Sequence, residues 1–420
     1  MKRAVDPHPL DRHFGLNVAG VSLVELLWGL GMPPLFESAF LQLFLHRLGA
    51  SSLLIGLIPS LAAAGSALSS LLSYSLTSHL ERRRTVVIIV HAGAAMPILI
   101  FGLALGATGI RASTLGLFLV LYAVFSLVMG LILPIWQNYI MKIFSETRAV
   151  PAMAVMMITQ SVAKLVGSLF LVRIVERYSF SAPGASLVFT LVGLLFLAGS
   201  LPFLLTAEEP GAGTQRVSGN LLRAAGRASL RRTFGHRGFL LFLGTDLEYF
   251  ALSVVLAFYA NYATQFCGIS PALASGLFMA CNYLGGVLAN GLLGWANLLS
   301  RRSKYLLTKA VALSGLILLS VYPVPWVFYA ASTAFGASRG TRLMVFTTSV
   351  KRLSGQPDAT LYFAVAPILA LPFSTGLPLF SGAFLDRFAS LGAGAFKIMF
   401  LGMAVLSLAG FLFATRMPRD

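Results

Sequence analysis

The stretch EEPGAGTQRVSGNLLRAAGRASLRRTFGHR, residues 208–237, is the only long polar segment of this chain. After Glu209 it contains no acid, and it carries six arginines: Arg216, Arg223, Arg227, Arg231, Arg232 and Arg237. Apolar blocks fill the sequence on both sides. We therefore interpret the stretch as a connector between two membrane-embedded halves, and expect a first helical bundle at 1–206, a basic linker at 207–237 and a second bundle at 238–420.

The composition fixes the class of protein. The chain of 420 residues is 57% hydrophobic and 11% charged, with a mean hydropathy of +0.84. A water-soluble fold of this length is not so apolar, so a multi-pass membrane protein is indicated. A net charge of +17 would suggest nucleic acid as the partner of a soluble chain. Here the basic residues flank apolar runs, where anionic lipid attracts them, so we expect membrane lipid and no nucleic acid as a partner.

A spanning helix needs about 20 mostly apolar residues, and that length predicts twelve spans, six on each side of the linker. They are 14–45, 51–77, 85–106, 114–140, 150–172, 184–206, 238–265, 270–299, 304–322, 325–350, 357–380 and 391–415.

The distribution of Lys and Arg predicts the orientation, because cytosolic loops carry an excess of both. With both termini inside, six basic residues fall outside: Arg47, Arg111, Arg173, Arg177, Arg387 and Lys397. Three fall inside spans: Lys164, Arg339 and Arg342. The other 22 of 31, Lys309 among them, fall on the cytosolic side. We expect a cell (inner) membrane protein with both termini in the cytoplasm.

The two halves repeat each other. Similar turns follow the first expected helix of each, Gly-Ala-Ser at 49–51 and Gly-Ile-Ser at 268–270. A basic pair follows each turn at the same spacing, Arg82 with Arg83 and Arg301 with Arg302, at a constant offset of 219 residues. Duplication of a six-helix unit explains this pattern, and it is a common way to build transporters.

At this point the chain resembles the major facilitator superfamily of secondary transporters. The family's glycine-acid-basic loop motif is similar to SYSLTSHLERRR at 73–84, to GWANLLSRR at 294–302 and to GAFLDR at 382–387. The resemblance implies an all-α integral membrane protein of twelve transmembrane helices in two pseudo-symmetric six-helix bundles. It also implies that Arg82, Arg83, Arg301 and Arg302 lie in cytosolic loops that take part in gating.

Charged residues inside spans are the candidate site residues, since each costs several kcal/mol when it faces lipid. They are three acids, Glu25, Asp246 and Glu248, and three bases, Lys164, Arg339 and Arg342. Glu25 lies about 11 residues into its span, roughly 16 Å deep and near the midplane. Asp246 and Glu248 are two residues apart, so on a helix they point to different sides.

The resemblance implies that the first, fourth, fifth, seventh and tenth helices line a cavity, and Glu25, Lys164, Asp246 and Arg339 match four of these helices. Glu25 or Asp246 suits proton uptake and release. Lys164 and the arginines suit an anionic group, and Trp28 suits a cavity wall. The alternative is that these charges form buried ion pairs that only fix the packing of the halves.

Helix breakers accompany the charges. Gly29 to Pro34 is expected to interrupt the first span just beyond Glu25, and Pro367 with Pro372 to interrupt the eleventh. Interrupted helices free backbone groups that a cavity can satisfy.

Together these features predict a monomeric secondary carrier, proton-linked (a symporter) or facilitative, that moves a small organic solute by alternating access. The alternative is a non-transporting protein of the same fold that acts as a sensor or assembly partner. Phosphate-loop, HExxH and GxSxG motifs are missing from the sequence, so we expect no enzyme activity, no cofactor and no metal.

Overall fold

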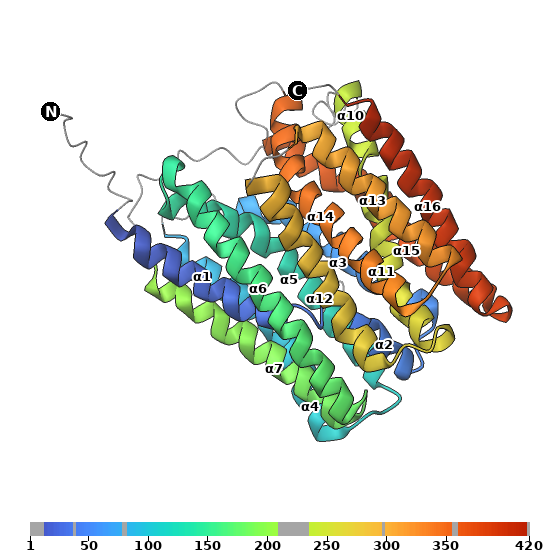
Figure 1. Ribbon diagram of the computed structural model, residues 1–420. Helices are drawn as coiled ribbons and strands as arrows, with labels where there is room; N and C mark the ends of the chain where they lie inside the picture. Colours follow the sequence, from blue (N-terminus) through green and yellow to red (C-terminus); the bar gives the residue numbers. More distant parts are fainter. Residues whose placement is uncertain are drawn as a thin grey trace.

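The computed structural model describes residues 12–36, 39–77, 82–208, 235–295, 299–354 and 360–417, and these residues form helices joined by short turns. Most of the expected linker, like the four residues 78–81 of the first basic loop, therefore lies outside the described residues. The described helices run roughly parallel and antiparallel in one bundle (Figure 1).

The first group of helices precedes the linker. It comprises α1 (Phe14–Gly31), α2 (Ala39–Arg47), α3 (Ser52–Thr77), α4 (Arg84–Thr108), α5 (Thr114–Ile143), α6 (Glu146–Tyr178), α7 (Ala182–Ser200) and a 3-10 turn, η2 (Leu201–Leu205). The expected first span is broken in two, as the sequence predicted. α1 ends at Gly31 and a turn contains Pro33 and Pro34, whose rings cannot continue the backbone hydrogen-bond ladder.

The second group follows the linker. It comprises α10 (Arg237–Gly244), α11 (Leu247–Phe266), α12 (Pro271–Ala289), a π-helical turn, η3 (Asn290–Trp295), α13 (Arg301–Val321), α14 (Pro325–Ser354), α15 (Thr360–Arg387), a 3-10 turn, η4 (Ala389–Leu391), and α16 (Ala393–Thr415). The expected seventh span is also broken, at Thr245 and Asp246 between α10 and α11. No Pro or Gly pair lies there that would have predicted this break.

Eleven helical stretches among the described residues are long and apolar enough to cross a membrane. The expected span at 325–350 corresponds to the 30-residue α14, which is not among these eleven and contains Arg339 and Arg342. α14 packs against α12 and α13 in the bundle, so its arginines need not face lipid.

The expected interruption of the eleventh span is wrong. α15 continues from Thr360 to Arg387 with Pro367, Pro372 and Pro378 inside it. A proline removes one backbone donor, but in membrane helices neighbouring side chains can satisfy the freed groups. The hydroxyls of Ser374 and Thr375 donate to the carbonyl oxygen of Leu371 within α15, whereas the carbonyl that Pro372 leaves without its usual donor is that of Ile368.

α1 begins and α16 ends at the same end of the bundle, which we call the terminal end; the opposite end is the far end (Figure 1). Large apolar side chains cover the outside of the bundle: Phe170 is 64% exposed, Phe380 68% and Val405 67%. Such a surface is stable against lipid rather than water. The chain is a multi-pass integral membrane protein.

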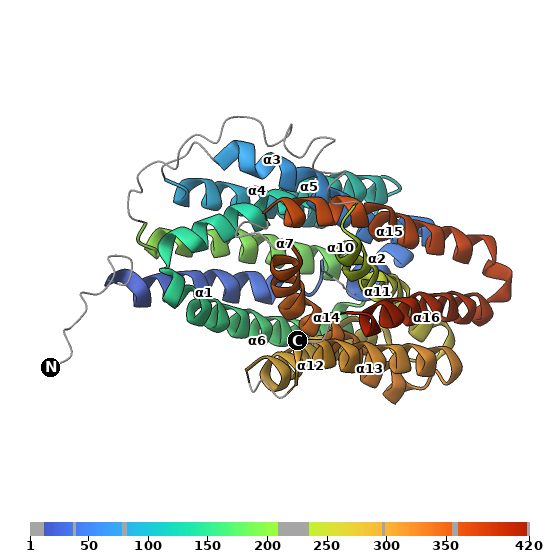
Figure 2. The same cartoon turned by 90° about the horizontal axis from the view of Figure 1, so that it is seen from above.

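The two groups meet mainly along two helix pairs, α3 with α15 and α6 with α12 (Figure 2), and α2 also contacts α11 and α12. Glycines bring the first pair close. A Cβ at Gly56 would collide with the backbone of Pro378, and one at Gly382 with the backbone of Ser52. Small residues at such crossings let membrane helices approach each other.

Candidate functional site

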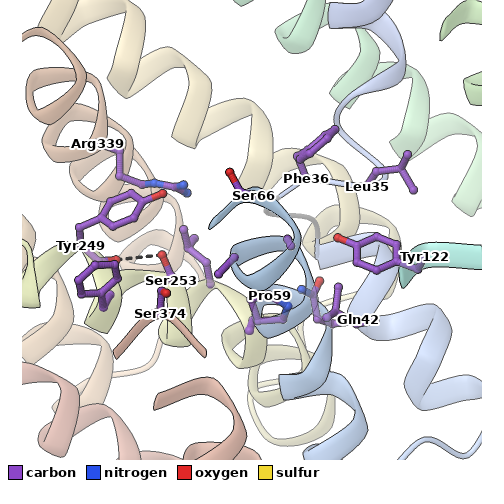
Figure 3. A pocket seen from close by; sticks show the side chains of 16 residues that line it. Leu35, Phe36, Gln42, Pro59, Ser66, Tyr122, Tyr249, Ser253, Arg339 and Ser374 are labelled. Carbon is purple, nitrogen blue, oxygen red and sulfur yellow. Dashed lines mark hydrogen bonds between the residues drawn. The ribbon is translucent and has the colours of Figure 1, made fainter. Parts of the chain in front are cut away.

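A cavity of about 310 Å³ lies between the two groups of helices (Figure 3). Residues of α2, α3 and α5 line it from the first group, and residues of α11, α14 and α15 from the second. Its wall mixes aromatic rings, among them Phe36 and Phe250, with polar side chains such as Gln42, Ser66 and Ser253. A mostly apolar pocket with a few polar groups is the usual form of a small-molecule site.

Arg339 is the one predicted site residue that lines this cavity directly. Its guanidinium lies 5.3 Å from the ring centroid of Tyr249, which also lines the cavity. A second guanidinium, that of Arg342, has its Cζ 4.1 Å from the same centroid. Tyr249 thus contacts both arginines of α14, and the sequence analysis did not single it out.

Glu25 lies on α1, which packs against α6 and α7, and it is not among the residues that line the cavity. Its side chain is buried, 6% exposed, and its carboxylate accepts a hydrogen bond from Nε2 of Gln160 on α6. Lys164, one turn further along α6, is close enough to act on Glu25 through its charge. The structure therefore brings together two residues that the sequence placed on separate spans.

Lys164 and Trp28 extend this cluster in two directions. The ammonium of Lys164 lies 5.6 Å from the ring centroid of Tyr283 on α12, so it also contacts the second group of helices. Trp28 packs away from the cavity: it stacks on Phe196 at 4.2 Å between centroids and meets the edge of His91 at 4.9 Å. These contacts place Trp28 in the core of the first group, among α1, α4 and α7.

Asp246 forms a bidentate ion pair with Arg342 at the break between α10 and α11. Nε of Arg342 donates to Oδ1 at 2.8 Å, and Nη2 donates to Oδ2 at 2.7 Å. This fork geometry fixes the guanidinium plane as well as the charge.

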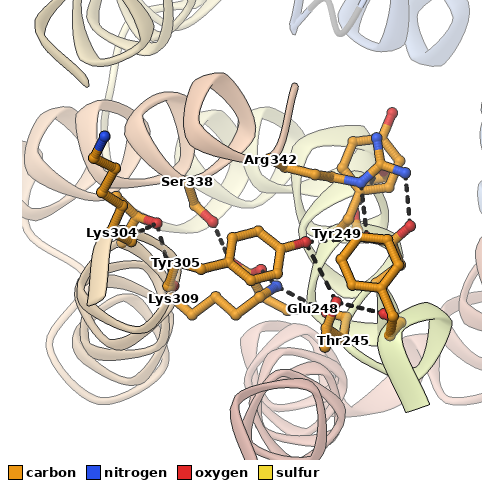
Figure 4. Close-up of polar contacts among 12 residues, drawn as sticks. Thr245, Glu248, Tyr249, Lys304, Tyr305, Lys309, Ser338 and Arg342 are labelled. Atoms are coloured by element: carbon orange, nitrogen blue, oxygen red, sulfur yellow. Dashed lines mark hydrogen bonds and ion pairs between the residues drawn. The ribbon is translucent and has the colours of Figure 1, made fainter. Parts of the chain in front are cut away.

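Glu248 forms a second buried ion pair, with Lys309 on α13 (Figure 4). Lys309 is 0% exposed and also donates to the backbone oxygen of Thr245 at 2.8 Å. Ser338 donates to the other carboxylate oxygen of Glu248 at 2.5 Å. The sequence analysis counted Lys309 with the basic residues of the cytosolic side; in the structure it is buried inside the bundle in an ion pair. It lies nine residues into α13, and the depth test that found Glu25 would have found it.

The two ion pairs form one network. The hydroxyl of Tyr305 donates to Asp246 at 3.4 Å and accepts from Thr245 at 3.3 Å. Asp246 and Glu248 do point to different partners, as their spacing predicted, although both sets of partners include a residue of α14.

The loop arginines make contacts within each group rather than between groups. Backbone amides of Arg83 and Arg84 donate to the two carboxylate oxygens of Glu208 at 2.8 and 2.9 Å, and Nζ of Lys142 donates at 2.7 Å. Burial alone raises the pKa of Glu208, but these hydrogen bonds outweigh it and hold the pKa below its ordinary value. Glu208 therefore caps the first turn of α4.

The remaining loop arginines occupy different environments. Arg82 is exposed. Arg302 donates to the backbone oxygen of Thr415 at the end of α16, and the side chain of Arg301 is outside the described part of the structure.

Contacts between the groups extend from the middle of the bundle to the far end. Oγ of Ser60 donates to the backbone oxygen of Thr375 at 2.7 Å. Nearer the far end, side-chain nitrogens of His46 and Gln265 lie 3.1 Å apart, and the carboxylate of Asp386 bonds to the first turn of α3.

Solved structures with this arrangement are membrane transporters. The nucleoside transporter NupG superposes with a TM-score of 0.69 at 12% identity, covering 98% of this chain and 99% of that one. An inward-facing, unoccupied bacterial homolog of the human lysosomal transporter Spinster gives 0.66 at 15% identity, covering 97% and 98%. FucP, a Major Facilitator Superfamily transporter in the outward conformation, gives 0.65 at 16% identity, covering 97% and 100%.

The chain thus shares the fold of these transporters. Residues 35–356 match the Major Facilitator Superfamily, and the chain belongs to that family. No curated protein matches the sequence.

Proposed function

We propose that the protein is a secondary carrier that moves a small organic solute across the membrane by alternating access. The observation that carries this proposal is the cavity lined by both groups of helices. Rocking of one group against the other around such a cavity changes the side from which it is reached.

We further propose that the terminal end faces the cytosol. The arginines near that end, Arg82 to Arg84 and Arg302 among them, follow the rule that cytosolic loops are basic. The contacts between the two groups that the structure describes lie in the middle of the bundle and at the far end. If the terminal end faces the cytosol, the far end faces outward, and we propose that this conformation is closed to the outside.

Glu25 is our candidate for proton coupling. Asp246 and Glu248 each meet a cation in an ion pair, whereas the hydrogen bond to Glu25 comes from a neutral amide, that of Gln160. The charge of Lys164 also acts on Glu25, but Asp246 and Glu248 are in direct contact with their cations, so we expect protonation to cost less at Glu25 than at either of them. A buried carboxylate of this kind is a common proton site in transporters.

Purified protein in proteoliposomes tests the carrier proposal. Candidate solutes are offered with and without an imposed pH gradient, and uptake is compared with that into protein-free liposomes. Accumulation that depends on the gradient supports a proton-linked carrier, and uptake only to equilibrium supports a facilitative one. A ligand that binds the protein but is never transported would instead support a sensor of the same fold.

A further inference from the structure

The internal repeat of the sequence extends to two pairs of polar residues. The offset of 219 residues that relates the basic pairs of the two halves also relates Gln42 to Asn261 and His46 to Gln265. The first member of each pair lies on α2 and the second on α11. The repeat thus gives the two groups of helices equivalent polar side chains on two helices that contact each other.

These equivalent positions meet near the far end. α2 lies beside α11 (Figure 2), and side-chain nitrogens of His46 and Gln265 lie 3.1 Å apart. Gln42 and Asn261 each precede these residues by one turn on the same helix, so they belong to the faces that meet. One turn further along α11, away from the far end, Ala257 lines the cavity together with Gln42. Gln42 and Asn261 therefore lie between the cavity and the outermost contact of the two helices.

Both amides are buried with an oxygen that lacks a donor. Gln42 is 4% exposed and Asn261 is 3% exposed. Within the described part of the chain, neither Oε1 of Gln42 nor Oδ1 of Asn261 accepts a hydrogen bond. Asn17, which is as deeply buried, uses both ends of its amide: Nδ2 donates to the oxygen of Ile143 at 3.1 Å, and Oδ1 accepts from the nitrogen of Ala207 at 2.7 Å. A buried acceptor without a donor has lost its hydration and gained no bond in return, which is unfavourable.

We infer that Gln42 and Asn261 oppose closure of the far end and so help to balance the two conformations of the carrier. This inference rests on the proposed alternating access and adds residues that set its equilibrium. In the present conformation both oxygens are shielded from water. Rocking of the two groups parts α2 from α11 and lets water donate to both oxygens. The cost of the missing hydrogen bonds therefore falls on the closed conformation alone.

Other contacts at the far end act in the opposite direction. The contact between His46 and Gln265 joins the two groups, as do the bonds from Asp386 to the first turn of α3. All of these are lost when the groups part. A carrier has to populate both conformations, so neither can be far more stable than the other. The two unsatisfied amides offset part of the stability that these contacts give to the closed conformation.

Distances between spin labels on the full chain in lipid nanodiscs measure this balance. The labels are placed at positions 111 and 322, on a background without Cys267 and Cys281. Both positions are exposed, the first between α4 and α5 and the second between α13 and α14, so each group carries one label at the far end. Short distances report the closed conformation and long distances the open one.

Gln42→Leu and Asn261→Leu remove the unsatisfied oxygens and fill the same space with an apolar side chain. Each should lower the ratio of long to short distances by about fivefold, because the closed conformation no longer buries an unpaired acceptor. Neither variant should melt at a lower temperature than the parent. Gln42→Met, which keeps the unbranched shape of glutamine, should give the same result as Gln42→Leu.

Gln265→Leu is the matched control. It makes a similar amide-to-leucine change one turn from Asn261 on the same face of α11, but at an amide that contacts His46. This variant loses a contact between the groups, so it should not lower the share of long distances. If it lowers that share as much as Asn261→Leu does, the added apolar surface explains the shift, and the inference is overturned.

The inference and the carrier proposal fail in different ways. If the parent shows both distance populations and their shares are the same in the Gln42 and Asn261 variants, the inference is overturned and the carrier proposal stands. One unchanging distance in the parent and in every variant contradicts alternating access itself, and both are then overturned.

Discussion

Oδ1 of Asp386, near the far end of α15, lies 2.7 Å from the backbone nitrogen of Ser52 at the start of α3. Oδ2 lies 2.9 Å from the nitrogen of Leu53. The carboxylate thus accepts two of the amide protons that the first turn of a helix leaves unpaired, at the positive end of the helix dipole. These bonds join residues 334 and 333 positions apart and connect the two groups of helices.

Asp386→Ala should therefore weaken the contact between the two groups of helices at the far end. The variant loses both hydrogen bonds and the favourable charge, at a cost of about 1 to 2 kcal/mol. In a protein that alternates between states, this cost shifts the population by roughly tenfold. Spin labels at positions 111 and 322, on a background without Cys267 and Cys281, should report a larger share of long distances in the variant.

Glu176→Ala is the matched control for Asp386→Ala. Glu176 also lies near the far end, but it pairs with Arg173 of its own helix at an exposed site. It should leave the distance distribution unchanged. An unchanged distribution in Asp386→Ala would show that this contact does not hold the far end closed.

Glu248→Gln should destabilise the second group of helices. It leaves Lys309 buried with its charge uncompensated, which costs on the order of 3 to 5 kcal/mol. Thermal unfolding in detergent should show a clear loss of stability. By contrast, Arg173→Ala removes one partner of an exposed pair and should cost less than about 1 kcal/mol.

A double variant isolates the pair. Glu248→Gln with Lys309→Met removes both charges and should recover much of the lost stability, because no buried ion remains alone. If the double variant is no more stable than Glu248→Gln, the pair is not what stabilises this region, and the assignment of Glu248 to a structural pair is wrong.

Sequence reasoning reached the membrane class, the break at Pro33 and the presence of buried charges, because each depends on local composition or depth. It did not reach the partners. Arg342 and Lys309 lie 96 and 61 residues from the acids they bind, and helix depth says nothing of which neighbour a side chain meets. The expected interruption of α15 was wrong for another reason. Prolines that would end a helix in a soluble protein are tolerated inside a membrane helix.

The residues that line the cavity could not be predicted from the sequence either. Gln42 and Tyr249 belong to it because α2 turns away from α1 and α11 from α10. No pattern in the sequence distinguished these two from the other polar side chains of the expected spans.

Glu208 should make stability depend on pH at the terminal end. Its pKa is lowered in the folded protein, so its contribution is present above the pKa of the unfolded chain, about 4.3 for a glutamate. The contribution is lost as the pH falls through the folded-state pKa. Glu208→Gln should therefore be less stable than the parent at pH 7, by about 1 kcal/mol, with the difference shrinking below about pH 4. Thermal unfolding of the parent and of Glu208→Gln at pH 7 and below about pH 4 measures the stability difference. An equal difference at the two pH values would contradict the prediction.

Glu25→Gln decides whether that carboxylate couples transport to protons. The amide has nearly the shape of the protonated acid and keeps an oxygen that can accept from Gln160. If Glu25 carries the proton, the variant should fold, exchange solute at equal pH and fail to accumulate it against a gradient. Uptake and exchange in proteoliposomes measure the two activities separately.

The competing role for Glu25 is a structural pair with Lys164, whose charge acts on it. In that case Glu25→Gln leaves the half-buried Lys164 without its counter-charge, so the melting temperature should fall together with all transport. Lys164→Met, added to Glu25→Gln, should then restore stability. Proton-driven accumulation that is undiminished in a stable Glu25→Gln protein would exclude the coupling role, because the amide cannot release and rebind a proton at any physiological pH.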